Sequence, residues 1–152
     1  MPVDWNEIGT SHEWLKRAKS NLTRARQPKP DDVIWEDLCF DAQQAAEKSI
    51  KAVLVFLGIQ FRFVHDIAEL LTLLETHGVI LPEEIKAATE LTNYAVETRY
   101  PGPTEPVTEE EFKQALLTAE AVFTWCEAKI QNGKKREHTN ITEEKNVEEI
   151  KN

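Results

Sequence analysis

Apolar residues recur at helical spacing along most of the chain, and no stretch of useful length alternates as a β-strand does. The longest helical pattern covers residues 35–58, where apolar side chains occupy one broad face and also fall on other sides. A helix that is apolar over so much of its surface is buried against several neighbours, and those can include a second subunit. We therefore expect residues 35–58 to form the central helix of an all-α bundle.

Capping and helix-breaking residues indicate where four further helices begin and end. The expected caps or first residues of the five helices are, in chain order, Thr10, Asp31 or Asp32, Asp66, Pro82 and Thr108. A glutamate three residues after Thr10, Asp66 and Thr108 completes a capping box at each of them. Gly58 is suited to end the central helix. The helix that opens at Pro82 is expected to run through Val96.

The same pattern divides the chain into three parts. Residues 1–9 are expected to be an N-terminal arm, residues 10–131 one helical domain, and residues 132–152 a polar charged tail. The five basic and five acidic residues of the tail cancel, so we expect it to be solvated and at most partly helical. A chain of 152 residues is one domain that can bury a core without disulfides or metal.

The formal charge of −9 makes the whole chain a poor general binder of nucleic acid, because phosphate binding needs a concentrated positive surface. The first helix is an exception. Its polar face is basic and carries Lys16, Arg17, Lys19, Arg24 and Arg26. Such a face is either solvated surface or a site for phosphate or for an acidic partner.

The two cysteines, Cys39 and Cys126, each lie in an apolar helical stretch and are expected to be buried, reduced thiols. No cysteine or histidine has the spacing of a metal site, so we expect no bound metal. No segment has the length of a transmembrane helix, and the N-terminus lacks the apolar run of a signal peptide. These observations favour a cytoplasmic protein that does not associate with a membrane.

Three motifs, taken in order, resemble the HEPN domain. They are FDAQQAAEKSIKA at residues 40–52, His65-Asp66 at the start of a leucine-rich helix, and Thr98-Arg99-Tyr100-Pro101 after the next helix. The resemblance covers residues 14–130 and implies an up-and-down bundle of about five helices, commonly a homodimer. It also implies nucleotide binding and, in many members, a minimal nucleotidyltransferase encoded alongside as a toxin–antitoxin partner.

Other HEPN proteins are metal-independent ribonucleases, and these carry an arginine followed by a histidine after four to six intervening residues. In that chemistry the histidine moves a ribose hydroxyl proton, and the arginine stabilises charge on the phosphate. None of His12, His65, His77 and His138 has an arginine at that distance before it. Arg62 precedes His65 by only two intervening residues, and this departure argues against ribonuclease activity.

Arg62, His65 and Asp66 form the first candidate site, and Arg62 and His65 are the only weak candidates for catalysis. In a structural interpretation, Asp66 caps a helix, His65 satisfies nearby backbone groups and Arg62 is solvated. In a functional interpretation, all three lie at the mouth of the bundle, where an imidazole and a guanidinium hold a phosphate. The sequence leaves both interpretations open.

The second candidate site consists of Tyr94, Glu97, Arg99 and Tyr100, just before a turn stiffened by prolines, with Tyr94, Arg99 and Tyr100 as its ligand residues. Arg99 is either a planar fork for phosphate or the partner of a carboxylate. Tyr100 either stacks on a ligand or packs under the prolines.

Lys48 and Lys51 on the central helix form the third candidate site. Both have a polar residue four positions earlier, Gln44 and Glu47, so both are expected to pair along a polar strip. The alternative is that the central helix lines a cleft of the dimer and both lysines face a shared anionic ligand.

Three functions are compatible with these features. The favoured one is a non-catalytic, dimeric module that binds a nucleotide of unknown identity and acts with a nucleotidyltransferase partner. The second is a ribonuclease toxin that uses His65 with Arg62 or Arg99, and RNA is a partner only under this alternative. The third is a structural dimerisation or adaptor bundle.

Overall fold

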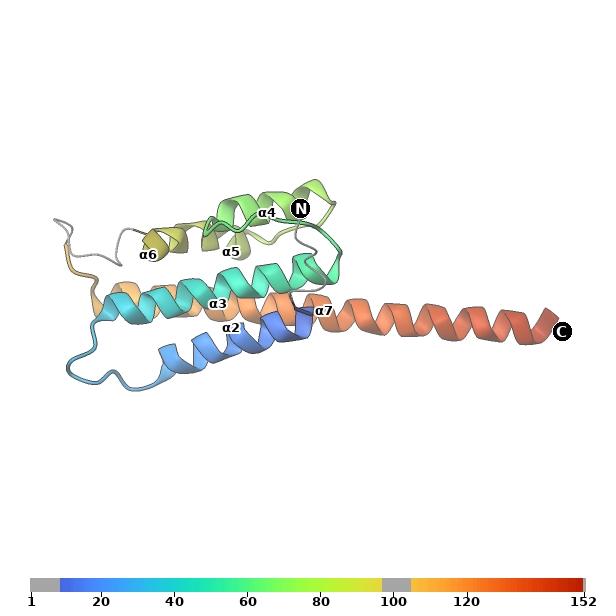
Figure 1. Cartoon of the computed structure of the whole chain (residues 1–152), viewed down its shortest axis with the longest axis horizontal. Helices are drawn as coiled ribbons and strands as arrows, with labels where there is room; N and C mark the ends of the chain where they lie inside the picture. Colours follow the sequence, from blue (N-terminus) through green and yellow to red (C-terminus); the bar gives the residue numbers. More distant parts are fainter. Residues whose placement is uncertain (1–8, 97–104, 152) are drawn as a thin grey trace.

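The computed structural model describes residues 9–96 and 105–151, with only the backbone described for Val96 and for residues 136–151. All regular secondary structure in these ranges is helical, as predicted (Figure 1). In chain order the elements are α2 (Ser11–Arg26), α3 (Trp35–Phe56), α4 (Ile67–Thr76), α5 (Glu83–Lys86), the 3₁₀ helix η1 (Ala87–Thr92), α6 (Asn93–Val96) and α7 (Glu109–Lys151).

Helix α3 is the centre of the bundle, as its apolar breadth predicted. Helices α2 and α7 pack along it, and α4, η1 and α6 also contact it, while α5 packs against α7 and η1 (Figure 1). Its fully buried apolar residues are Cys39, Ala42, Ala45, Ala46, Ile50, Ala52, Val53 and Leu54. The alanines present little side chain, which lets the neighbouring helices approach closely. The expected all-α helical bundle is therefore the observed fold.

Three of the predicted helix starts are confirmed by their capping hydrogen bonds. The Glu13 amide donates to the Thr10 hydroxyl at 3.2 Å, and the Glu111 amide donates to the Thr108 hydroxyl at 3.1 Å. Asp66 caps α4 in the same way, by accepting from the amide three residues later.

The predicted cap of α3 is wrong. The residue before α3 is Ile34, whose side chain makes no capping hydrogen bond, and Asp31 and Asp32 lie earlier, in a turn. That turn is closed by the Val33 amide, which donates to the Pro30 carbonyl at 3.1 Å. The turn therefore delays the start of the helix beyond the reach of either aspartate.

The helix expected from Pro82 through Val96 is interrupted. Pro82 precedes a single α-helical turn, α5, which passes into η1 and then into the short α6. Two threonine hydroxyls in η1 form other bonds: Thr89 donates to the Lys86 carbonyl, and Thr92 accepts from the Ile67 amide at 3.2 Å. Such bonds compete with regular helix geometry, and the bond to Ile67 ties η1 to the start of α4.

The segment between α3 and α4 returns along the surface of α3. Gly58, at a φ of 71°, provides the left-handed residue that ends α3, as predicted. In this segment the Phe61 ring lies under the Lys51 ammonium, and further along His65 contacts the Glu47 carboxylate. Residues 59–66 therefore cover a strip of α3 before α4 begins.

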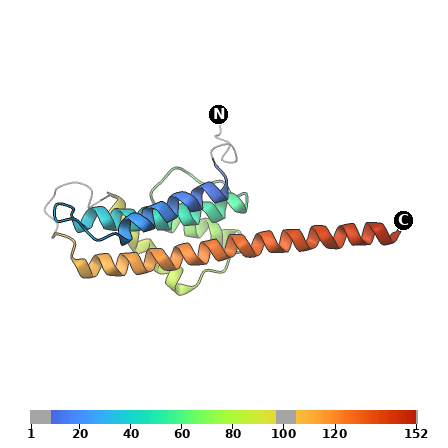
Figure 2. The same cartoon turned by 90° about the horizontal axis from the view of Figure 1, so that it is seen from below.

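Helix α7 extends far beyond the bundle (Figure 2). It crosses residue 131 without a break and continues to Lys151, so the helix expected over part of the tail extends over most of it. The division of the chain at residue 131 stays a prediction, and residues 1–8 of the expected arm lie outside the described part. Among the described residues, no helix combines the length and apolarity needed to span a membrane.

The cysteines lie where the apolar pattern predicted. Cys39 and Cys126 are both fully buried, and neither forms a disulfide. Burial raises the pKa of the Cys39 thiol to about 12, with the carboxylates of Glu111 and Glu36 adding to the effect. Burial alone raises the pKa of Cys126.

Candidate functional site

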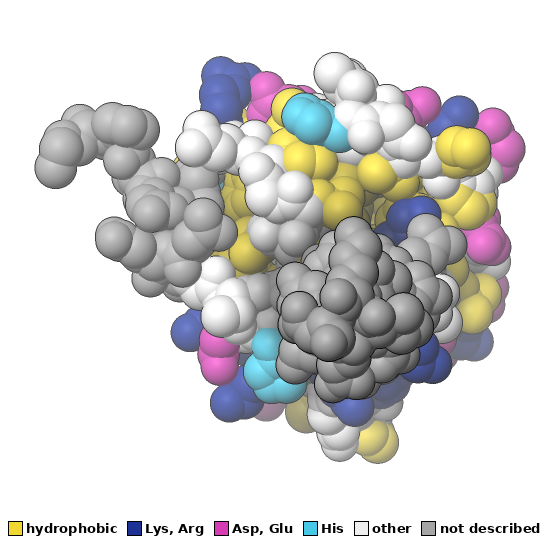
Figure 3. Space-filling model, turned by 90° about the vertical axis from the view of Figure 1, so that its right-hand side faces the viewer, with side chains coloured by type: hydrophobic (Ala, Val, Ile, Leu, Met, Phe, Trp, Pro, Cys, Tyr) yellow, Lys and Arg dark blue, Asp and Glu magenta, His cyan; other side chains and the backbone are white. Residues whose placement is uncertain are grey.

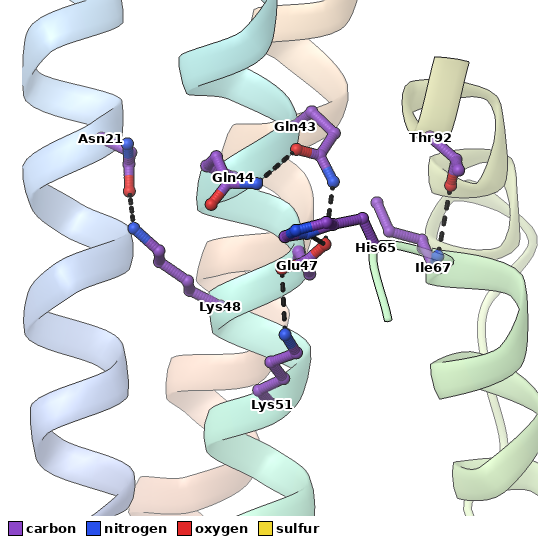
Figure 4. Close-up of polar contacts among 9 residues, drawn as sticks. All are labelled: Asn21, Gln43, Gln44, Glu47, Lys48, Lys51, His65, Ile67 and Thr92. Atoms are coloured by element: carbon purple, nitrogen blue, oxygen red, sulfur yellow. Dashed lines mark hydrogen bonds and ion pairs between the residues drawn. The ribbon is translucent and has the colours of Figure 1, made fainter. Parts of the chain in front are cut away.

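Helix α3 buries polar side chains on two sides, and these are the polar residues of the FDAQQAAEKSIKA motif. One strip faces residues 59–66 and the other faces α2 (Figure 4). The buried polar and charged residues of the helix are Asp41, Gln43, Gln44, Glu47, Ser49 and Lys51. Because buried polar groups must find partners within the protein, their contacts define how the two strips are organised.

Glu47 is the centre of the first strip. Its side chain is 2% exposed, and its Oε2 pairs with the Lys51 ammonium at 3.0 Å. Its Oε1 accepts from the Gln43 amide at 3.1 Å and contacts His65 Nδ1 at 2.9 Å. The Lys51 ammonium also lies over the rings of Trp14 and Phe61. The buried carboxylate therefore has three donors, and the contacts with His65, Trp14 and Phe61 join this strip to α2 and to residues 59–66.

The Glu47–Lys51 pair was predicted from its spacing, but the Gln44–Lys48 pair was not formed. Gln44 donates instead to the side-chain oxygen of Gln43 at 2.7 Å, and Lys48 turns toward α2. Gln44 and Lys48 do not pair because each has another partner beside it: the Gln43 side chain for Gln44, and Asn21 of α2 for Lys48.

The contact with Glu47 orients the His65 ring, with Nδ1 facing the carboxylate. A carboxylate only accepts hydrogen bonds, so a hydrogen bond here requires the proton on Nδ1. The His65 side chain is 55% exposed, while that of Glu47 is 2% exposed. A buried carboxylate therefore orients a half-exposed imidazole, in the manner of a carboxylate–histidine pair in enzymes.

The second strip joins α3 to α2 through Asn21. The Lys48 ammonium donates to the Asn21 side-chain oxygen at 2.8 Å, and the Asn21 amide donates to Asp41 at 3.0 Å. Arg24 adds an ion pair with Asp41 at 3.3 Å. Burial lowers the pKa of Lys48, and the nearby Glu47 carboxylate partly opposes this.

A cleft of about 290 Å³ opens beside the second strip, and it is lined by Gly9, Glu13, Trp14, Arg17 and Lys48. Trp14 and Arg17 lie three residues apart on α2 and therefore share one side of that helix. In the part of the chain that the structure describes, Arg17 forms no ion pair. The cleft thus combines an indole ring with two cationic groups and one carboxylate.

The structure separates the other members of the first predicted site. Arg62 is 77% exposed and pairs with Glu69, to which its Nε donates at 3.0 Å. Asp66 accepts from the Glu69 amide and so serves as the cap of α4. His65 bonds to a side chain rather than to the backbone groups expected for it. Arg62, His65 and Asp66 thus each have a different partner and do not converge on one point.

Tyr94 is the described member of the second predicted site. It is half-buried in α6 and bonds to Cys39 of α3, and its pKa is raised by burial and by that thiol. Tyr94 therefore belongs to the packing between α6 and α3. Glu97, Arg99 and Tyr100 lie outside the described residues, so their part in this site stays a prediction.

Within residues 9–95 and 105–135, no three or more histidine, cysteine, aspartate or glutamate side chains are placed to hold a metal ion. The candidate chemistry in this region therefore rests on imidazole, ammonium, guanidinium and indole groups.

Comparison with known proteins identifies the family. The sequence profile of the HEPN domain matches residues 11–129, most of the chain. The chain belongs to the HEPN domain family. No protein of curated function matches it.

Two solved structures share the HEPN fold with this chain. The protein TT1696 from Thermus thermophilus is 31% identical, with a TM-score of 0.68 over 78% of this chain and 97% of its own. ST0689, an archaeal HEPN homologue, is 30% identical, with a TM-score of 0.65 over 80% of this chain and 98% of its own. The resemblance drawn from the three motifs is therefore confirmed, as is the helical bundle it implied.

The sequence did not single out Trp14 as a site residue, and it offered Arg17 only as one member of a basic face that could bind phosphate. Trp14 belonged to the apolar face of the first helix and Arg17 to its basic face. The signal that could have joined them is their spacing of three, which places an aromatic ring beside a guanidinium on a helix. The sequence does not reveal that this side of α2 meets Lys48 of α3.

Proposed function

We propose that this HEPN protein is a non-catalytic, dimeric cytoplasmic module that binds a nucleotide and acts with a minimal nucleotidyltransferase in a toxin–antitoxin pair. The observation that carries the nucleotide part is the cleft of Trp14, Arg17 and Lys48. The partner and the dimer are the arrangement that HEPN membership implies.

The cleft offers the groups that a nucleotide needs. Arg17 supplies a planar fork for phosphate oxygens, and Lys48 supplies a second positive charge as a compact ammonium. The Trp14 indole offers a flat surface for a base. The Glu13 carboxylate at the rim accepts hydrogen bonds from a ribose hydroxyl or from an amino group on the base. Of the predicted ligand residues, Lys48 lines this cleft, whereas Lys51 is occupied by Glu47.

Calorimetric titration with ATP as the probe tests this cleft. The wild-type protein should bind ATP, and Arg17→Ala or Lys48→Ala should each weaken binding at least tenfold, or about 1.4 kcal/mol. Lys113→Ala is the matched control. It removes an exposed lysine near the start of α7, which does not line the cleft, and should leave the affinity for ATP unchanged. An absence of ATP binding by the wild-type protein contradicts the nucleotide part of the proposal.

Affinity purification from the native host, followed by mass spectrometry, tests the partner. A nucleotidyltransferase should be recovered in stoichiometric amount. A different outcome would identify a structural adaptor. In that case the wild-type protein does not bind ATP, and the Arg17→Ala and Lys48→Ala variants recover the same partners as the wild type.

A second candidate function is the metal-independent ribonuclease, which the Glu47–His65 contact favours. With Nδ1 facing Glu47, the other nitrogen of this half-exposed ring, Nε2, can accept a proton when the ring is neutral, as a general base requires. Arg62 or Arg99 would supply the positive charge. Purified protein should then cleave RNA in the presence of a chelator, and His65→Ala should abolish the cleavage. Equal cleavage by that variant rules this function out.

A further inference from the structure

A second groove runs between α2 and α7, on the face where the basic side of α2 meets α7. Its volume is about 340 Å³. Helix α2 contributes His12, Leu15, Lys16 and Lys19, and α7 contributes Phe123, Glu127, Ile130, Gln131 and Lys134. On each helix these residues follow spacings of three and four, so each helix presents one continuous stripe to the groove.

The groove has an apolar floor and a basic rim. Leu15 and Phe123 are partly buried, and Ile130 is almost fully buried, while Lys16, Lys19 and Lys134 are exposed. These three lysines form no ion pair with the described part of the chain. Lys and Arg side chains also lie around the base of α7 at this end of the molecule (Figure 3).

The chemistry of the groove favours an acidic helix over nucleic acid. A phosphate backbone is polar throughout and would leave the apolar floor of the groove uncovered. An amphipathic helix matches the groove better: its apolar residues can pack on the apolar floor, and its glutamates can pair with the lysines of the rim, as in helix-in-groove recognition.

The C-terminal part of this chain has that composition. Residues 142–150, TEEKNVEEI, hold four glutamates against one lysine. They also include Val147 and Ile150, at the three-residue spacing that shares a helix side. This segment belongs to α7, which continues to Lys151 beyond the bundle (Figure 2).

The helix cannot place this segment in the groove of its own molecule. Lys134 lines the groove, and residue 142 lies eight positions further along the same helix, about 12 Å away at 1.5 Å per residue. The segment points away from the bundle (Figure 2). It is therefore available to another molecule, and a second copy of the chain supplies a groove of complementary charge.

We infer that two copies exchange their C-terminal helices, so that residues 142–150 of each lie in the α2–α7 groove of the other. The two α7 helices then run antiparallel past a two-fold axis near residue 136. The arrangement is self-complementary, as a closed dimer requires. This inference rests on the dimer of the proposed function and names the surface that forms it. It does not involve the Trp14–Arg17–Lys48 cleft.

A charge exchange in the full-length chain tests this dimer. One variant, Lys16→Glu with Lys19→Glu, makes the groove acidic. The other, with Glu143, Glu144, Glu148 and Glu149 each changed to Lys, makes the tail basic. Light scattering after size exclusion should find the wild-type protein dimeric and each variant monomeric at concentrations where the wild type is paired, with dissociation constants raised at least tenfold.

An equimolar mixture of the two variants should restore the dimer, because each groove then meets a tail of opposite charge. This rescue also shows that both variants are folded. Lys86→Glu with Lys113→Glu is the matched control, since it reverses one half-exposed and one exposed lysine away from the groove and should leave the dimer intact. The wild-type dimer should weaken as salt rises.

The possible failures are distinguishable. The exchange of helices is overturned if the single variants dimerise like the wild type, or if their mixture stays monomeric. Either result still allows the wild-type protein to dimerise through another surface. A wild-type protein that is monomeric at every concentration overturns both the exchange and the proposed dimer. Titration of the same samples with ATP reports separately on the nucleotide cleft.

Discussion

The Glu47 carboxylate meets the His65 imidazole at 2.9 Å, and this contact joins the middle of α3 to the residue just before the cap of α4. Glu47 is also the ion-pair partner of the buried Lys51. One buried side chain therefore fixes both a charge inside the bundle and the path of residues 59–66. Substitution of Glu47 therefore removes the partner of both Lys51 and His65.

We predict that Glu47→Ala lowers the free energy of unfolding by about 3–5 kcal/mol, because it leaves the Lys51 ammonium buried and unpaired. His65→Ala should cost less, since this ring is 55% exposed. Replacing both charges, as Glu47→Leu with Lys51→Met, should recover most of the loss. Urea unfolding followed by circular dichroism measures each value. A Glu47→Ala protein as stable as the wild type contradicts the importance of this strip.

An exposed ion pair provides the comparison. Lys113 lies 3.7 Å from both Glu109 and Glu110, and all three side chains are more than half exposed. Lys113→Ala should change the free energy of unfolding by less than about 1 kcal/mol. The contrast with Glu47→Ala shows that burial, not the number of ion pairs, decides the effect.

The two aspartate caps predicted from sequence should behave differently. Asp66→Ala removes an acceptor for the Glu69 amide and should destabilise the protein by about 1 kcal/mol. Asp32→Ala should have almost no effect, since Asp32 lies in the turn before Ile34 and caps no helix. Thermal unfolding of both variants checks this, and an equal loss for the two would show that Asp32 has a role which the structure does not give it.

These cases show what the sequence could predict. The central helix was predictable, because its apolar face leaves few ways to exclude water. Thr10, Asp66 and Thr108 were predictable as caps because capping depends on local spacing. The burial of Glu47 and Lys51 was not predictable, since it depends on residues 59–66, which carry no periodic signal. The cleft of Arg17 and Lys48 depends in the same way on how α2 and α3 pack.

Gly133 of α7 lies against Phe56 of α3, where a Cβ atom would come within 2.7 Å of the ring carbon Cζ. In an isolated helix, Gly→Ala stabilises by about 1 kcal/mol. Here we predict that Gly133→Ala destabilises the protein instead, by about 1–3 kcal/mol, because the ring must move. Adding Phe56→Leu should relieve the clash, so that the double variant loses less than the sum of the two single variants in urea unfolding. Additive losses would show that the ring and Gly133 are not in contact.

Nucleotide binding should depend on the charge of Lys48. Burial lowers the pKa of this ammonium below its ordinary value of 10.5, and a bound phosphate raises it again by favouring the charged form. Affinity for ATP should therefore fall as pH rises through the pKa of the free protein, by up to about tenfold per pH unit, and level off above the pKa of the complex. The decline should begin at lower pH than an ordinary lysine would give.

Lys48→Arg provides the control, because a guanidinium stays charged throughout this range. Calorimetric titration with ATP across alkaline pH should show a decline for the wild type and a much flatter profile for Lys48→Arg. Circular dichroism at each pH confirms that the bundle is intact. The same decline in both proteins would place the titrating group elsewhere, and it would remove Lys48 from the nucleotide site while leaving Arg17 to be tested by its own substitution.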